Sequence, residues 1–216
     1  MMACNRLGAA LLGGGAMLMF LVVALAADNN GGADWEEIKH ADGIRVLSTD
    51  VAQDIVKVKA IAVLAASPQA VRAVIDAVAQ QPAWVPYLTE TRVLKNISPD
   101  EALLYSRFDA HWPARDRDFV YRSRVSRDAA GRIVYRLESY QSPLMPERDD
   151  YVRGILMEGL YIIEPKDKDS ARVEFMFHAD PRGRLPLWIV NIVQRRFPFQ
   201  ALLGLRERLG LNAAAP

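Results

Sequence analysis

A long apolar segment follows a run of strand-like patterns near the C-terminal end of the chain, and this order constrains the fold more than any other feature. Residues 186–209 are too many for one strand, so they indicate a C-terminal helix. Asn191 and residues 194–196 are among its polar members. We expect Pro198 to kink or divide this helix, because an interior proline removes a helical hydrogen bond.

Alternating polarity predicts strands over most of the remaining chain. The predicted strands span residues 44–49, 55–64, 91–97, 102–108, 119–125, 133–139, 151–163 and 172–179. Between the second and third of them, Ser67 and Pro68 predict a helix start, since a hydroxyl can cap the helix and proline fits its first turn. Its apolar stripe continues to residues 81–82.

Two or three strands, one or two short helices, about six consecutive strands and a long final helix are typical of an α+β fold with an antiparallel sheet. Such a sheet can curl around the final helix. The sheet and the helix need not fill the space between them, and that space could hold an apolar ligand.

The N-terminal residues suggest export. No charged residue occurs from residue 7 to residue 27, and Ala24, Leu25 and Ala26 form the small-x-small pattern that signal peptidase accepts. We predict a signal peptide over 1–26, a flexible linker over 27–33 and a periplasmic or secreted protein. The alternative is an uncleaved anchor, because the run approaches the ~20 residues that span a bilayer. The single cysteine, Cys4, precedes the cleavage point.

Charge and motif content exclude several function classes. The formal net charge is +1, so the chain has no field to collect nucleic-acid phosphates. The three histidines, His40, His111 and His178, lack the spacing of a metal site, and we expect His178 to face solvent. Nucleophile motifs are missing as well. We therefore predict no catalytic residue, no metal and no cofactor.

Residues 112–120 (WPARDRDFV) resemble the W-P-x-x-x-R-D-F-V signature of START (steroidogenic acute regulatory protein-related lipid transfer) domains. Residues 180–186 (DPRGRLP), followed by Trp188 and Asn191, are similar to the segment that leads into their C-terminal helix. Further matches in the family's order are Trp35 with residues 42–44, Trp84, and residues 152–153 with 164–165. The resemblance predicts a START-like lipid-binding domain over 34–210 and a disordered tail over 211–216.

The resemblance implies a helix-grip fold, in which a curved antiparallel sheet wraps around the C-terminal helix and leaves an internal apolar cavity. It also implies that the chain carries or sequesters a lipid, a sterol-like or another hydrophobic molecule in a tunnel under that helix, as a monomer with transient membrane contact. Some sterol-binding members have an arginine where this chain has Ser123, so a sterol preference does not follow. The alternatives are a cyclase- or aromatase-like enzyme of the helix-grip superfamily, and an interaction module with a collapsed cavity.

The inward positions of the predicted elements give the candidate cavity residues. Period-two alternation groups residues 119, 121 and 123 on one strand and 135 and 137 on another, while three- and four-residue steps define the inner face of the last helix. The expected cavity residues are Trp84, Phe119, Tyr121, Ser123, Tyr135, Leu137, Val190, Val193, Phe197 and Ala201.

The charged pair Arg117 and Asp118 is expected to pin a turn or an adjacent strand rather than to catalyse. The resemblance adds further residues to this structural motif, namely Asp180, Gly183, Pro186 and Asn191.

We expect signal peptidase to cut after Ala26, because Ala24 and Ala26 occupy its small-residue positions. N-terminal sequencing of the exported protein should read Ala27 first. Recovery of an intact residue 7–27 segment in the membrane fraction would contradict this prediction.

Overall fold

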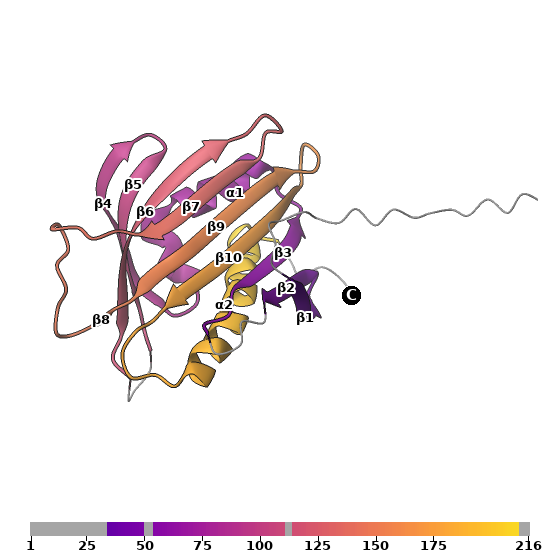
Figure 1. Ribbon diagram of the computed structural model, residues 1–216. Coiled ribbons are helices and arrows are strands. Elements are labelled where there is room, and N and C mark those ends of the chain that lie inside the picture. Colours follow the sequence, from indigo (N-terminus) through magenta and orange to yellow (C-terminus); the bar gives the residue numbers. More distant parts are fainter. Residues whose placement is uncertain (1–33, 50–53, 111–113, 212–216) are drawn as a thin grey trace, which may run out of the picture. The chain divides into compact units, whose positions relative to one another are not determined.

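The computed structural model describes residues 34–49, 54–110 and 114–211 (Figure 1). The predicted signal peptide 1–26, the predicted linker 27–33, His111, Trp112 and residues 212–216 of the predicted tail lie outside the described residues. Across the part of the chain that is described, no helix is both long and apolar enough to cross a membrane.

Ten strands, two α-helices and one 3₁₀ helix make up the described chain. In chain order they are β1 (Trp35–Ala41), β2 (Ile44–Thr49), β3 (Val58–Leu64), α1 (Pro68–Asp76), η1 (Val78–Ala83), β4 (Leu88–Ser98), β5 (Glu101–Phe108), β6 (Arg117–Arg127), β7 (Ile133–Ser139), β8 (Val152–Arg153), β9 (Ile155–Pro165), β10 (Ala171–Asp180) and α2 (Leu187–Arg208).

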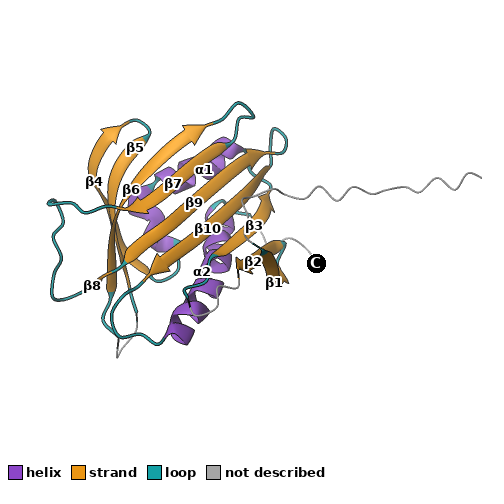
Figure 2. Ribbon diagram, in the orientation of Figure 1, coloured by secondary structure: helices purple, strands orange, loops and turns teal. Residues whose placement is uncertain are grey.

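The strands form one sheet in the order β1-β2-β3-β10-β9-β7-β6-β5-β4. Neighbouring strands along this path are antiparallel, and the short β8 adds a parallel pairing to the start of β6. Figure 2 shows the helices on one face of the curved sheet. The predicted α+β helix-grip fold is confirmed.

The two α-helices begin as the sequence indicates. Ser67 caps α1, because its Oγ accepts a hydrogen bond from the Ala70 amide at 3.2 Å, and Pro68 occupies the first turn. Pro186 immediately precedes α2. Pro198 lies inside α2 without dividing it, so the predicted segment forms a single helix.

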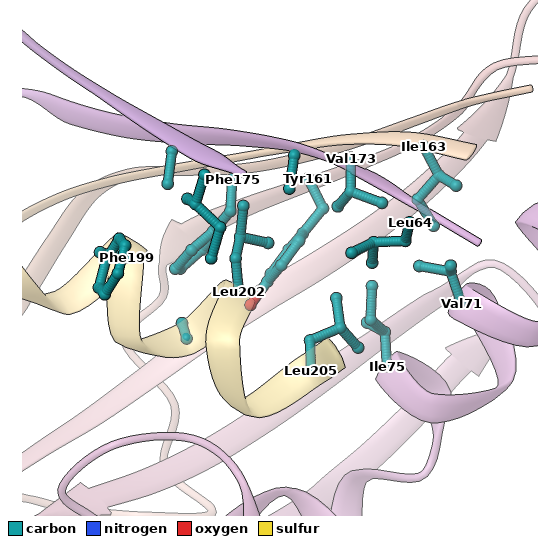
Figure 3. Close-up of a cluster of buried hydrophobic side chains, with 14 of the residues drawn as sticks. Leu64, Val71, Ile75, Tyr161, Ile163, Val173, Phe175, Phe199, Leu202 and Leu205 are labelled. Carbon is teal, nitrogen blue, oxygen red and sulfur yellow. The ribbon is translucent and has the colours of Figure 1, made fainter. Parts of the chain in front are cut away.

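The main core lies between the sheet and the C-terminal half of α2. Leu202 and Leu205 are fully buried, and they belong to the same cluster as Leu64 on β3 and Ile163 on β9 (Figure 3). α1 contributes Val71 and Ile75 to this cluster. Together with Pro68, these two residues form the buried face of the helix. This core leaves the other end of α2 outside it, where the helix borders a cavity instead.

Glycine allows two close approaches that position the helices and β6. A Cβ at Gly204 in α2 would lie 2.1 Å from the carbonyl oxygen of Trp84, so only glycine lets the end of η1 pack directly on α2. A Cβ at Gly154 would lie 2.4 Å from the Phe119 ring. Gly154 also separates β8 from β9, which the sequence predicted as one strand over 151–163.

A buried ion pair fixes the start of β6 on the outer face of the sheet. Arg153 of β8 donates from Nε and Nη2 to the two carboxylate oxygens of Asp118, both at 2.9 Å, and Asp118 is fully buried. Arg153 also donates to the Met145 carbonyl. The predicted structural role of Asp118 is thus met through Arg153, and not through its neighbour Arg117.

We predict that Asp118→Asn destabilises the fold, because it leaves the Arg153 guanidinium largely buried without its counter-charge. Breaking such a pair typically costs about 3–5 kcal/mol, or roughly 10 °C in Tm for a domain of this size. A thermal melt checks this. Asp150→Asn removes the exposed pair with Arg148 and should change Tm little.

The folded fraction of the Asp118→Asn variant should still capture ligand. An unchanged Tm combined with loss of a measurable turnover would contradict the structural role.

Candidate ligand-binding cavities

The larger of two neighbouring cavities has a volume of about 340 Å³ and lies between the inner face of the sheet and the segment that forms α1 and η1. The inward side chains of β5, β6 and β7 form its wall. They are Ala102, Leu104, Ser106 and Phe108 on β5, Phe119, Tyr121, Ser123 and Val125 on β6, and Tyr135 and Leu137 on β7. From α2 only Phe197 reaches it.

The smaller cavity, of about 230 Å³, lies under the N-terminal half of α2. Ile189, Val190 and Val193 of the helix border it, together with Leu185 just before the helix. Tyr87 forms part of the opposite side. The space that the sequence predicted under the C-terminal helix corresponds to this cavity, while the larger one extends beneath α1 and η1.

Four phenylalanines line both cavities and form the partition between them, namely Phe108, Phe119, Phe177 and Phe197. The Phe108 ring lies edge-on to those of Phe119 and Phe197, with centroids 5.7 and 6.0 Å away. The rings of Phe177 and Phe197 are 4.6 Å apart. The two cavities therefore share these four rings in their walls.

A chain of hydroxyl groups runs from the larger cavity into the sheet. Tyr121 Oη lies 2.9 Å from Ser106 Oγ, which is 3.2 Å from Thr91 Oγ1, and Thr91 bonds the Tyr105 carbonyl at 3.1 Å. Burial raises the pKa of Tyr121. Tyr121 is thus held neutral and fixed in position at the cavity wall.

Tyr135 and Tyr161 are paired across β7 and β9 and both line the larger cavity. The Tyr135 hydroxyl donates to Asp76 Oδ1 at 2.6 Å. Burial, followed by the bond to Asp76, raises the pKa of Tyr135. Burial raises the pKa of Tyr161 as well, and its ring stacks on Phe175 at 4.2 Å. Both phenols therefore keep their protons at neutral pH.

The charged side chains around the larger cavity are paired with one another or with neighbours. Arg72 of α1 bonds Asp76 at 3.0 Å and Asp100 at 3.5 Å. Glu101 lies 3.3 Å from Arg122. Among the described residues that line this cavity, no cation is left without a counter-charge.

Arg117 lines the smaller cavity from the start of β6. It donates to the carbonyl oxygens of Arg115 and Arg182, and burial lowers its pKa. The Arg117 Nε and the Oε1 of Gln194 are enclosed by protein and have no hydrogen-bond partner in the described chain. Gln194 Nε2 donates to the Ala179 carbonyl at 2.5 Å.

The structure brings most of the predicted cavity residues together. Phe119, Tyr121, Ser123, Tyr135, Leu137 and Phe197 line the larger cavity, and Val190 and Val193 line the smaller one. Trp84 and Ala201 belong to the main core cluster, as Tyr135 and Phe197 also do, but they line neither of these two cavities. The backbone of Trp84 packs on Gly204 of α2.

The motif residues before and within α2 shape the turn that leads into the helix and attach the helix to a neighbouring segment. Asp180 accepts a hydrogen bond from the Arg182 amide at 2.7 Å, and Gly183 has a φ of +75° that favours glycine. Asn191 attaches α2 to the chain before β3, accepting from the Val56 amide at 3.2 Å and donating to the Asp54 carbonyl at 3.3 Å.

The alternation of β10 predicted that His178 faces solvent, but in the structure His178 is half-buried. Its Nε2 lies 3.0 Å from the Ile55 carbonyl, and burial lowers its pKa. The segment before β3 covers this position. Strand alternation alone carries no information about such a covering segment.

Sequence reasoning missed the contribution of α1 and η1 to the cavity wall, and it missed Phe108 and Phe177. Phe177 is two residues from Phe175, so its alternation was a usable signal. Phe108 is the last residue of β5. The bounds of a predicted element are least certain at its ends, so the pattern did not fix the direction of the Phe108 side chain.

The chain is similar to known proteins over most of its length. The START domain family model matches residues 28–214. The chain is 27% identical over 165 residues to the phosphatidylcholine transfer protein of Mus musculus, covering 74% of this chain and 76% of that protein.

Two solved structures share the fold. A STAR-related lipid transfer protein from Xanthomonas axonopodis matches with a TM-score of 0.73 and 28% identity over 82% of this chain and 98% of that one. Human STARD10 matches with a TM-score of 0.76 and 18% identity over 81% and 72% of the two chains.

We predict that Phe197→Ala costs less stability than a Phe→Ala change in solid core, which is typically ~3–5 kcal/mol. Phe197 borders space on two sides, so its removal merges cavities instead of creating one in packed core. Phe199→Ala, on the same helix and in the same core cluster but lining neither of the two cavities, should cost the full amount. Denaturant unfolding of both variants compares them.

Phe197→Ala should also weaken retention of a fluorescent lipid or sterol analogue. If it unfolds the ligand-free protein while wild type binds no lipid class, the space is filled in solution and the prediction fails.

Proposed function

Because the chain belongs to the START domain family, we propose that it is a carrier that holds a hydrophobic molecule inside the domain and shields it from water. The observation that carries this proposal is the pair of adjacent, mainly apolar cavities joined at four phenylalanine rings. Burial of each CH₂ of a ligand contributes about 0.8 kcal/mol, so an apolar chain can be retained without many specific bonds.

Two of the similar proteins are named as lipid-transfer proteins, and this supports the proposed function. The mouse relative is a phosphatidylcholine transfer protein, and the Xanthomonas axonopodis relative is a STAR-related lipid transfer protein. Both similarities extend over most of the present chain, 74% and 82% of it respectively. The class of ligand proposed here is therefore a lipid or lipid-like molecule.

The arrangement of charges favours a carrier over an enzyme. Asp118 is held by Arg153 on the outer face of the sheet, on the opposite side from the cavity wall. Asp76 is occupied by Arg72 and Tyr135. These carboxylates act as structural anchors, and we propose that the ligand leaves the protein unchanged.

The N-terminal half of α2 provides a surface for transient contact with a membrane. Leu187, Trp188, Ile192 and Val193 are exposed there, and Val193 also borders the smaller cavity. Arg195 and Arg196 lie on exposed positions of the same helix, and no acidic residue occurs between Asp180 and Glu207. We propose that this surface contacts an anionic lipid surface while ligand exchanges.

We further propose that the carrier works outside the cytoplasm, in the periplasm or after secretion. The charge-free run over 7–27 and the Ala24–Ala26 pattern support this location.

We predict that native mass spectrometry of the purified protein detects a bound apolar molecule. Ala102→Trp should prevent its retention, because Ala102 lines the larger cavity and the indole would fill that space. Ala129→Trp, at an exposed turn position, should retain the molecule. Retention by the Ala102→Trp variant at the wild-type level would contradict a ligand in the larger cavity.

We predict that Trp188→Ala slows lipid transfer between vesicles without reducing equilibrium retention. Trp188 is 65% exposed and contributes to neither cavity, so its loss affects membrane contact alone. A fluorescence transfer assay with anionic vesicles measures the rate. Tyr140→Ala, which removes an exposed aromatic side chain elsewhere, is the control, and equal slowing by both variants would refute the assignment.

A further inference from the structure

The hydroxyl groups of the larger cavity differ in whether their single proton is already committed to the protein. Thr91 donates to the Tyr105 carbonyl at 3.1 Å, and a carbonyl oxygen can only accept. Ser106 donates to Thr91 Oγ1 at 3.2 Å. Tyr121 must therefore supply the proton in its 2.9 Å contact with Ser106. The Tyr121 oxygen offers only lone pairs to the cavity.

The proton of Tyr135 is also used in a hydrogen bond to the protein. Its hydroxyl donates to Asp76 Oδ1 at 2.6 Å, and Arg72 Nε donates to the other carboxylate oxygen of Asp76 at 3.0 Å. The proton of Tyr135 is therefore also unavailable to a ligand.

Tyr161 is the exception among the three phenols. The residue is 8% exposed, and its hydroxyl makes no hydrogen bond within the described chain. Its hydroxyl is not sealed by protein atoms, so it is open to the cavity that Tyr161 lines. Figure 3 shows the ring directed from the sheet toward α2, with the hydroxyl at its far end. Tyr161 can donate its proton to a ligand.

The remaining polar groups of the larger cavity narrow the chemical class of ligand further. Ser123 also lines the cavity with a hydroxyl that makes no bond in the described chain, and it can either donate or accept. The charges of Arg72 and Glu101 are balanced by Asp76, Asp100 and Arg122. A carboxylate or phosphate in this cavity would meet no unpaired cation, and burial of an unpaired charge is strongly unfavourable.

Building on the proposed carrier function, we propose that the larger cavity binds an uncharged lipid alcohol, with Tyr161 donating to the ligand hydroxyl and Tyr121 accepting from it. An alcohol satisfies both phenols, because a hydroxyl has one proton and two lone pairs. An ether or an ester satisfies Tyr161 but has no proton for Tyr121. The two tyrosines thus act as specificity-determining residues at the polar end of an otherwise apolar site.

Four probes that share one alkyl chain test this inference, namely hexadecanol, its methyl ether, hexadecanoate and hexadecane. Their Kd values are measured by displacement of a fluorescent long-chain alcohol from the full chain. We expect hexadecanol to bind roughly three- to tenfold more tightly than the ether, the difference that one net hydrogen bond makes. Hexadecanoate should bind more weakly than hexadecanol.

Two variants separate the roles of the phenols. Tyr121→Phe should weaken hexadecanol to the level of the ether and leave the ether unchanged. Tyr161→Phe should weaken both by a similar factor and leave Tm unchanged, since that hydroxyl bonds nothing in the protein. Tyr140→Phe, an exposed tyrosine outside both cavities, should change no Kd.

The outcomes distinguish this inference from the carrier function. Equal binding of all four probes, tighter binding of hexadecanoate, or an unchanged alcohol-to-ether ratio in Tyr121→Phe overturns the inference and leaves the carrier function standing. Failure of every probe, hexadecane and the fluorescent alcohol included, overturns both. If Tyr121→Phe does not fold, the probe series on wild type and Tyr161→Phe still decides the outcome.

Discussion

Along β6, successive side chains alternate between two environments that cannot be exchanged. Asp118 points to the outer face, where Arg153 binds both of its carboxylate oxygens, while Phe119 and Tyr121 point to the cavity. A slip of one residue would turn the carboxylate into the apolar space and the phenylalanine outward. The ion pair therefore fixes the register of the cavity wall as well as the strand, although it lies on the opposite face from any ligand.

The cavities persist because the helices are supported at a few points and do not pack along their full length. At Gly204 the carbonyl of Trp84 meets the backbone of α2, so the two segments cannot approach further. In the middle of α2, the ring of Phe197 rests against Phe108 and Phe177. Beyond Phe197, beneath α1 and η1, the inner face of the sheet is only partly covered, and a cavity of about 340 Å³ remains there.

Much of the fold could be predicted because its determinants are local. Strand alternation located β2 and β7 with their exact bounds, and Ser67 with Pro68 marked the start of α1. β1 was not among the predicted strands, since its side chains are mostly exposed and show little alternation of burial. The break at Gly154 could not be predicted either, because it depends on the Phe119 ring, which is distant in sequence.

The sequence predicts which side chains face the inside of the domain, but not which of them border a cavity. Period-two alternation is enough to turn Tyr121 and Tyr135 inward, and the structure places both at the cavity. Whether an inward residue borders open space or solid core depends on what lies opposite. Trp84, Ala201 and Phe197 all belong to the main core cluster, but only Phe197 of these three also borders the two cavities. The committed protons of Tyr121 and Tyr135 likewise depend on partners that only the folded chain assembles.

The two halves of α2 are attached to the sheet by different interactions. After Pro198, Leu202 and Leu205 are fully buried in the main core. Before it, Asn191 and Gln194 attach the helix by side-chain hydrogen bonds, Val190 is buried, and Leu187, Trp188, Ile192 and Val193 are exposed. Proline removes one backbone hydrogen bond between the halves. Displacing the residues before Phe197 would therefore cost a few hydrogen bonds and the burial of Val190 while Leu202 and Leu205 stay in the core, which makes the smaller cavity the less costly route for a ligand.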